Sequence, residues 1–246
     1  MKKQRMEISA DAELKIADNS EAVIVIRPDK DGGDCTVRLD IGKGCTVTAY
    51  TISERKAKIN QTNKLKARSS LRSYSLWLSG GEAKTITTLA ESGANAREVF
   101  VFLAKDSERL VVDSELRHAA PDTKGDILVK GVVKDRARAD LGGMIKVMKK
   151  GSGAESFLSE HAILLDSGAR ATADPKLEIE NNDVMSRHSA SVSQINENKL
   201  FYLMTRGLPR DDAKALIVSG FLESAIGRIE DESFRKEFAG MLGKGI

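Results

Sequence analysis

The chain has 246 residues, of which 41% are hydrophobic and 30% charged, so it can bury a core and is not disordered as a whole. Lysine and arginine number 39 against 36 aspartates and glutamates, and the charges are scattered, which argues against nucleic acid as a partner. No apolar run is long enough to cross a bilayer, so we expect no membrane contact.

The N-terminal stretch MKKQRMEISADAELK carries basic residues but no apolar run behind them, which argues against a signal peptide. The chain has two cysteines, Cys35 and Cys45, without a CxxC pair or zinc-type spacing. Free cysteine is among the most buried residue types, so we expect both to be core residues of adjacent strands. The low cysteine count fits a reducing compartment, and we expect a cytoplasmic protein.

Much of the chain alternates apolar and polar residues with period two, which predicts β-strands. Each run covers roughly seven to eleven residues and ends in glycine, aspartate or another turn-forming residue. In chain order the runs are EAVIVIRP (21–28), CTVRLDIG (35–42), CTVTAYTI (45–52), SLRSYSLWLSG (70–80), AKTITTLAE (83–91), EVFVFLA (98–104), ERLVVDSELR (108–117) and GDILVKGVVK (125–134).

A weak internal repeat accompanies these strands. Short polar or glycine turns followed by alanine recur at Ala137, Ala154 and Ala169, about 15 to 17 residues apart. Such spacing, with small corner residues, predicts coils of a β-solenoid, although a sandwich of regular hairpins gives turns at similar intervals.

The run DVMSRHSASVSQ (183–194) places a histidine in what otherwise reads as an exposed strand. Alternate side chains of a strand share a face, so His188 lies with Val184, Ser186 and Val192. From the residues alone, a satisfied core or interface histidine is the simpler interpretation, and a working ligand is the alternative.

After Ile195 the pattern becomes helical, which places a β body at residues 1–195 and a helical subdomain at 196–246. A first helix ends at Gly207, a second has Pro209 in its first turn, and a third begins near Asp231. The second helix has an apolar stripe that we expect to pack against the end of the β body, formed by Leu216, Ile217, Phe221, Ala225, Ile226 and Ile229.

Several motifs in one order carry a family likeness. They include HAAP at 118–121, KGV at 130–132, PKLEI at 175–179, the histidine strand, and FYL at 201–203 followed by Arg206 and Gly207. From roughly residue 93 to 222 the sequence resembles the SufB/SufD family of iron–sulfur cluster assembly scaffolds.

The resemblance implies a right-handed parallel β-helix with a small C-terminal helical subdomain, dimerisation through the β-helix, and docking of a SufC-type ABC ATPase on the helices. The dimer is either a homodimer or a heterodimer with a SufB-like paralogue. ATP is then bound and hydrolysed by the partner, since the sequence has no Walker motif. We therefore expect a scaffold and not an enzyme, with no nucleotide bound by this chain.

At the histidine the chain is similar to SufD-like members. His188 falls on the family histidine, whereas Ser186 stands where those members have cysteine. SufB-like members have a cysteine one coil earlier and a glutamate after the histidine; Glu160 and Ser189 take those places here. The resemblance implies a role for His188 in handling iron or a transient iron–sulfur cluster, with Glu178 and Glu160 as helpers.

The remaining candidates are weaker. We expect His118 to be a hydrogen-bonded turn residue and His161 a partly exposed strand residue. The expected ATPase contacts on the helices are exposed charged residues: Arg206, Arg210, Asp212 and Lys214. Because the cluster thiolates are absent, a second interpretation stays open, in which the chain keeps the fold and the ATPase docking but has lost cluster chemistry.

Overall fold

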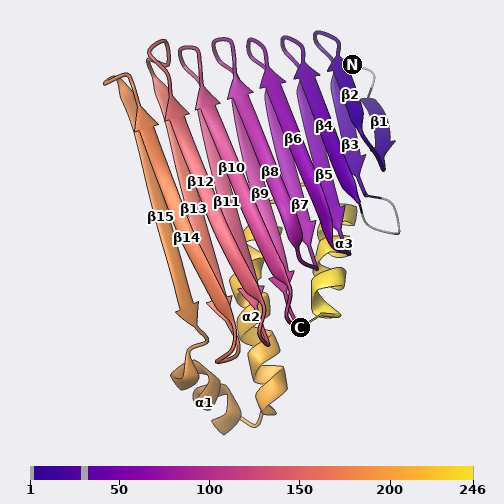
Figure 1. Cartoon of the computed structure of the whole chain (residues 1–246), viewed down its shortest axis with the longest axis vertical. Helices are drawn as coiled ribbons and strands as arrows, with labels where there is room; N and C mark the ends of the chain where they lie inside the picture. The colour runs from indigo at the N-terminus through magenta and orange to yellow at the C-terminus, as the bar shows by residue number, and fades with distance from the viewer. Residues whose placement is uncertain (1–2, 29–32, 246) are drawn as a thin grey trace.

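The computed structural model describes residues 3–28 and 33–245 and is a flattened parallel β-solenoid with three helices along one side (Figure 1). The odd-numbered strands form one sheet, here the odd sheet: β1 (Lys3–Ile8), β3 (Glu21–Ile26), β5 (Thr46–Ser53), β7 (Ser70–Trp77), β9 (Asn95–Ala104), β11 (Lys124–Val133), β13 (Ala154–Leu164) and β15 (Val184–Gln194). The even-numbered strands form the even sheet: β2 (Ala12–Ile16), β4 (Asp34–Ile41), β6 (Ala57–Leu65), β8 (Gly81–Leu89), β10 (Arg109–His118), β12 (Arg138–Val147) and β14 (Arg170–Ile179).

Neighbouring strands in both sheets are parallel and in register, so the chain coils and does not form hairpins. Ser70 on β7 pairs with Asn95 on β9, 25 residues on, and Lys124 on β11 pairs with Glu155 on β13, 31 residues on. A coil therefore contains one strand from each sheet, and the recurring interval of 15 to 17 residues is half a coil. The β-solenoid expected from the repeat is confirmed.

One corner of the solenoid is built from stacked left-handed residues. Each donates its backbone N–H to a carbonyl of the next coil, as Asn19 does to Lys43 and Gly153 does to Asp183, both at 2.7 Å. The corner residues with positive φ are Asn19, Gly44, Arg68, Gly93, Asp122 and Gly153. Because glycine, asparagine and aspartate tolerate this conformation best, the turn chemistry fixes where each coil bends.

The core fills the space between the two sheets. Inward positions alternate with outward ones, as on β12, where Ala139, Leu141, Ile145 and Val147 are buried and Arg138 is exposed. This is the period-two pattern read from the sequence, and its apolar side faces the opposite sheet in every coil.

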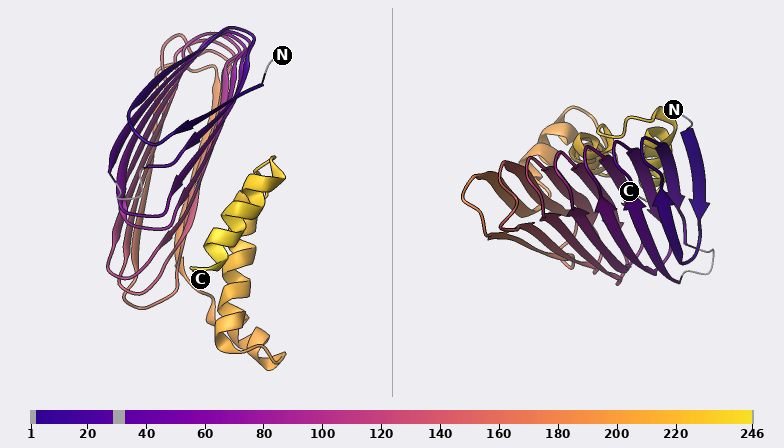
Figure 2. Two further views of the ribbon diagram at one scale, coloured as in Figure 1. Left: turned by 90° about the vertical axis from the view of Figure 1, so that its right-hand side faces the viewer. Right: turned by 90° about the horizontal axis from the view of Figure 1, so that it is seen from above.

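A second apolar layer lies between the outer face of the odd sheet and the helices α2 (Arg210–Ile226) and α3 (Glu232–Gly243), which run along that face (Figure 2). The short helix α1 (Glu197–Thr205) packs on α2. Tyr50 stacks on Phe234 of α3 with ring centroids 3.6 Å apart, and on Tyr74 at 5.5 Å. The Tyr74 hydroxyl donates to the backbone oxygen of Arg228 at 2.8 Å. Aromatic stacking and one buried hydrogen bond thus fix the helices to the solenoid wall.

The second helix does not lie at the end of the β body, where its apolar stripe was expected to pack. It packs on β9 and β11, on the wall of the solenoid and not at its end, through Val218, Leu222, Ala225 and Ile226. Leu216 is 52% exposed, because the apolar residues cover more than one side of the helix and only one side meets the sheet. Pro209, expected in the first turn of α2, instead precedes the helix as its N-cap. The third helix begins at Glu232, near Asp231 as expected, and the Asp231 side chain caps it by accepting from the Ser233 and Phe234 N–H groups.

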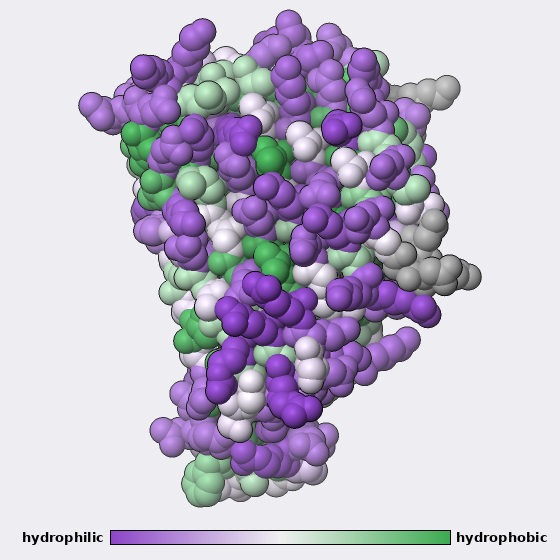
Figure 3. Space-filling view, viewed as in Figure 1, coloured by the Kyte–Doolittle hydropathy of each residue, from purple (hydrophilic) through white to green (hydrophobic). Residues whose placement is uncertain are grey.

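The outer face of the even sheet has no helix over it and is mostly hydrophilic (Figure 3). This view also shows hydrophobic side chains along the edge where the last strands lie. Among residues 3–28 and 33–245, no helix is both long and apolar enough to span a membrane.

Candidate functional site

The last coil, β14 and β15, is the open end of the solenoid. Each strand pairs on one side only, and every side chain of the two strands is partly or fully exposed. Apolar side chains lie in the open there, with Ile179, Met185 and Val192 at 43%, 58% and 38% exposure. An unpaired strand edge beside exposed apolar side chains is typical of a surface that joins another molecule.

His188 lies in the middle of β15, on the side of the strand that faces the solenoid interior. Val184, on the same side, packs against the core, and the Ser186 hydroxyl is 2.8 Å from that of Ser156 on β13. His188 pairs in register with Leu158, but no coil lies beyond it, so the imidazole is exposed. The interpretation as a packed core histidine is therefore excluded for the isolated chain.

Glu160 is the carboxylate on that same inward side of the neighbouring strand. It pairs in register with Ala190, two positions beyond His188, which puts the Glu160 and His188 Cα atoms roughly 8 Å apart from ordinary strand dimensions. The side chain is fully buried, and neither carboxylate oxygen has a hydrogen-bond partner in the described part of the chain. Burial, followed by the charge of Asp174, raises the pKa of Glu160 to about 7.

A glycine on the opposite sheet makes room for this carboxylate. A Cβ at Gly143 on β12 would lie 2.7 Å from the Glu160 Oε1 and 2.7 Å from the Leu158 methyl groups. The pocket for Glu160 therefore depends on the absence of a side chain at position 143.

Glu178 is placed differently. It lies on the outer face of the even sheet, exposed, and forms an ion pair with Lys146 on β12. The structure does not bring Glu178 together with His188, because the two side chains leave different sheets in different directions.

The other two histidines serve local contacts. His118 is fully buried, its Nδ1 lies 2.8 Å from the Thr123 hydroxyl across the turn, and burial lowers its pKa to about 4. His161 lies on the outer face of the odd sheet, 2.7 Å from the Ser191 hydroxyl, and burial together with Lys130 lowers its pKa. These placements match the turn and strand roles expected for them.

Among the described residues neither Cys35 nor Cys45 forms a disulfide, and both are 1% exposed, as expected for core residues. Cys35 lies on β4 and Cys45 directly precedes β5, in the first coils and thus at the opposite end of the solenoid from β15. Within residues 3–28 and 33–245, no three histidines, cysteines or carboxylates form a group that could hold a metal ion.

The helical side offers a second exposed surface, formed by α1 and the start of α2. Phe201 and Tyr202 are 69% and 56% exposed, and Arg206 lies over the Tyr202 ring at 5.2 Å. Arg210 donates to Glu197 at 3.2 Å.

The expected ATPase contacts lie on or beside this surface. Arg206, Arg210 and Asp212 are exposed. Lys214 is half-buried, with its Nζ 4.0 Å from Asp166.

Sequence reasoning missed a polar network in the solenoid interior. Gln61 donates to Asn63, Asn63 to Thr87, and both Thr87 and Ser114 donate to the buried Glu98. Burial raises the pKa of Glu98, against the lowering effect of the two hydroxyl donors. The alternation KINQTNKL already places Gln61 and Asn63 between Ile59 and Leu65 on one face, which was the available signal.

The family model described as "SUF system FeS cluster assembly, SufBD core domain" matches residues 3–221. The iron–sulfur cluster assembly protein SufD of Bacillus subtilis is 27% identical over 164 residues, which is 67% of this chain and 38% of that protein. SufB of the same organism is 28% identical over 153 residues, 60% of this chain and 33% of that protein.

An iron–sulfur cluster assembly SufBD family protein of Mycobacterium tuberculosis is 31% identical over 153 residues, 60% of this chain and 18% of that protein. The matched part thus spans less than two fifths of the length of these relatives. The family match covers every described strand of the solenoid, including the one that carries His188, together with α1 and most of α2. On this match, the chain belongs to the SufB/SufD family of the SUF iron–sulfur cluster assembly system.

Proposed function

We propose that this chain is a non-enzymatic scaffold subunit of the SUF machinery, which dimerises through its solenoid and docks a SufC-type ABC ATPase through the helical subdomain at residues 196–246. The observation that carries the proposal is the position of His188, exposed on the last strand of an open solenoid end. A partner that binds this end can supply the remaining ligands of a site that includes His188.

The dimer surface in this proposal is the edge of the last coil. β15 is 11 residues long and pairs only with β13, so one side of its backbone is free to bond a partner strand. Ile179, Met185 and Val192 supply exposed apolar area beside that edge. The partner is a second copy of this chain or a SufB-like paralogue.

The cargo in this proposal is iron or a nascent iron–sulfur cluster, held at the dimer surface by His188. Neutral imidazole is the form of histidine that binds a metal ion. Glu160 is the better placed of the two carboxylate helpers, because it lies on the inward side of the neighbouring strand, whereas Glu178 faces away. The irons of a cluster are held mainly by cysteine thiolates, and a paralogue that carries cysteine is the source of thiolate that fits best.

The ATPase in this proposal binds the α1–α2 surface, where Phe201, Tyr202 and Leu216 are exposed beside Arg206 and Arg210. An exposed apolar helix face with flanking charges suits a groove on a partner domain. ATP hydrolysis takes place in the partner, and its ATP-driven dimerisation opens the scaffold interface over His188.

The test is anaerobic reconstitution of the scaffold–ATPase complex with iron and sulfide, read by visible absorption and by iron and sulfide content. We expect His188→Ala to lose the cluster and His161→Ala to keep it, because His161 lies one strand away on the outer face. Equal cluster content in both variants would contradict the role of His188. Failure of the ATPase to co-purify with the wild-type chain would contradict the docking.

A second candidate function is a docking subunit that has lost cluster chemistry. The specific observation in its favour is that the described residues hold no three-ligand group, and that Cys35 and Cys45 are buried at the far end. Reconstitution together with a cysteine-bearing paralogue separates the two candidates, since a docking subunit gives the same chromophore with His188→Ala as with wild type.

A further inference from the structure

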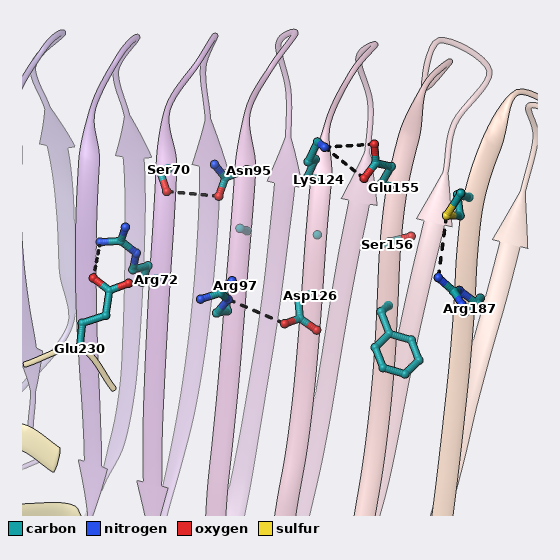
Figure 4. Close-up of a pocket in the computed structure, with 14 residues that line it drawn as sticks. Ser70, Arg72, Asn95, Arg97, Lys124, Asp126, Glu155, Ser156, Arg187 and Glu230 are labelled. Carbon is teal, nitrogen blue, oxygen red and sulfur yellow. Dashed lines mark hydrogen bonds and ion pairs between the residues drawn. The ribbon is translucent and has the colours of Figure 1, made fainter. Parts of the chain in front are cut away.

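An open groove of about 620 Å³ runs across the outer face of the odd sheet, on the part of that face that the helices leave uncovered (Figure 4). The strands β7, β9, β11, β13 and β15 contribute to it, and Glu230, from the segment between α2 and α3, lies at its side. Five strands at the usual spacing give the groove a length of about 19 Å, which is the span of roughly six extended residues.

The groove is lined by two parallel rows of side chains, because the coils are stacked in register. One row runs through Ser70, Asn95, Lys124, Glu155 and Met185. The other runs through Arg72, Arg97, Asp126, Phe157 and Arg187. Each row therefore places side chains about 4.8 Å apart along a straight line.

The carboxylates of the groove are already paired. Glu155 is bound by Lys124 at 3.0 Å and Glu230 by Arg72 at 3.1 Å. Asp126 is held at 2.7 Å by Arg228, a residue outside the groove lining, and is 3.8 Å from Arg97.

After this pairing, two arginines of the groove, Arg97 and Arg187, are not neutralised by a close carboxylate of the described residues. Arg97 keeps only the longer contact to Asp126, and it lies directly beside Arg72 on the neighbouring strand. Like charges opposite each other in a sheet repel. At the other end of the row, Arg187 contacts only the Met185 sulfur, at 3.9 Å, among the described residues.

The groove also has an apolar end. Phe157 is 40% exposed and Met185 58% exposed, and they lie beside Arg187 on the last two strands of the sheet. A ligand that fits the whole groove therefore has carboxylates for the arginines and at least one apolar group for Phe157 and Met185.

We infer that this groove binds an acidic segment of a partner protein with apolar residues between its acidic ones, laid across β7 to β15. Nucleic acid fits less well, because its regularly spaced phosphates would also lie over Asp126 and Glu155, whereas a peptide can place neutral side chains there. A small anion fits less well too, because it would occupy only one end of the groove and would leave the apolar end at Phe157 and Met185 uncovered.

Such a segment touches the back of the strand that carries the candidate ligand. Met185 and Arg187 face the groove, while Ser186 and His188 alternate with them toward the interior. The inference stands apart from the cluster chemistry proposed above, since it needs neither iron nor the ATPase.

The test is fluorescence anisotropy of a labelled peptide of alternating glutamate and leucine, titrated with the full chain at low and high salt. We expect salt-sensitive binding, and we expect Arg97→Glu and Arg187→Glu each to weaken it by roughly tenfold or more. Lys84→Glu is the matched control. Lys84 lies outward on the even sheet, is 53% exposed against 47% for Arg97, and is 3.6 Å from Asp113, much as Arg97 is 3.8 Å from Asp126.

Three results would overturn the inference: equal loss of binding in Lys84→Glu, equal binding of a lysine–leucine peptide, or displacement of the peptide by inorganic phosphate at matched ionic strength. The last result would make the groove a small-anion site. Circular dichroism of each variant separates lost binding from lost folding.

Discussion

One outward row of the odd sheet changes character along its length while its backbone stays the same. In register, it passes through Tyr74, Val99, Leu128, Ser159 and Ser189. Tyr74 is 1% exposed beneath the helices, whereas Ser189 is only half-buried on the last strand. The side chains in the middle of the solenoid are therefore covered within this chain. The last coil has the same backbone conformation, but its side chains are left uncovered.

This contrast separates stability from function in the molecule. The middle coils bury their side chains on both faces of the odd sheet, so changes there alter the free energy of unfolding. The last coil buries few side chains, so substitutions there alter the association of the chain with a partner and not its free energy of unfolding. Four sets of measurements test this division between a stabilising middle and an associating end, from the largest expected effect to the smallest.

Phe238→Ala removes a fully buried ring from the layer between α3 and the odd sheet, where it meets Tyr50 edge-on at 6.4 Å. We expect a loss of about 3–5 kcal/mol in the free energy of unfolding, measured by urea titration. Phe201→Ala, in a residue 69% exposed, is the control and changes it by less than about 0.5 kcal/mol. Similar losses of unfolding free energy in both variants would contradict the distinction between a covered middle and an open end.

His118 makes the middle of the solenoid sensitive to acid. Burial lowers its folded-state pKa to about 4, below the ordinary value near 6.5, so folding favours the neutral ring. Its contribution is fully present above pH 6.5 and is lost as the pH falls toward 4, by about 3 kcal/mol. Urea titrations from pH 7.5 to 4.5 check this, with His118→Gln expected to lose less stability over that range. Parallel pH profiles would show that His118 does not titrate in this way.

Gly81→Ala tests the close packing of strand starts. An added Cβ would lie 2.1 Å from the Ala57 backbone oxygen, and the φ of Gly81 is +134°, so we expect a loss of about 1–3 kcal/mol. Gly220→Ala in α2 meets nothing within 4 Å and gains about 0.5–1 kcal/mol in helix propensity. Thermal unfolding of the two variants gives shifts of opposite sign if this is correct, and shifts of one sign contradict it.

Met185→Ser and Val192→Ser act on the open end. Both side chains are exposed, so each change alters the free energy of unfolding of the isolated chain by less than about 0.5 kcal/mol. Sedimentation velocity at several protein concentrations then reports on association through this edge, which we expect both variants to weaken. A large loss of stability in the isolated chain would show that the last coil is part of the core.

The solenoid could be predicted from the sequence because its two causes are local. Period-two alternation defines each strand, and small corner residues such as Ala137, Ala154 and Ala169 recur once per strand and are fully buried. The start of α3 could also be predicted, since Asp231 caps it through its own side chain.

What could not be predicted depends on which residues stack across coils. The separation of Arg72 and Arg97 in the sequence predicts a contact only when the coil length is known, so the groove could not be predicted. Glu178 was expected to help His188, but their strands β14 and β15 belong to different sheets. Leu216 fits a helical apolar pattern as well as Leu222 does, and only the position of the sheet decides which one is buried.

The described part of the solenoid also tapers, so its first and last coils differ in width. The strands at its first end, β1 and β2, have 6 and 5 residues, whereas β15 and β14 have 11 and 10. If copies stacked head to tail, each long edge would meet a short one, and nearly half of its backbone groups would stay unpaired. Head-to-tail joining is the arrangement that produces filaments. Unequal strand lengths in the first and last described coils therefore disfavour head-to-tail stacking of copies of this chain, whereas two wide ends match each other in length.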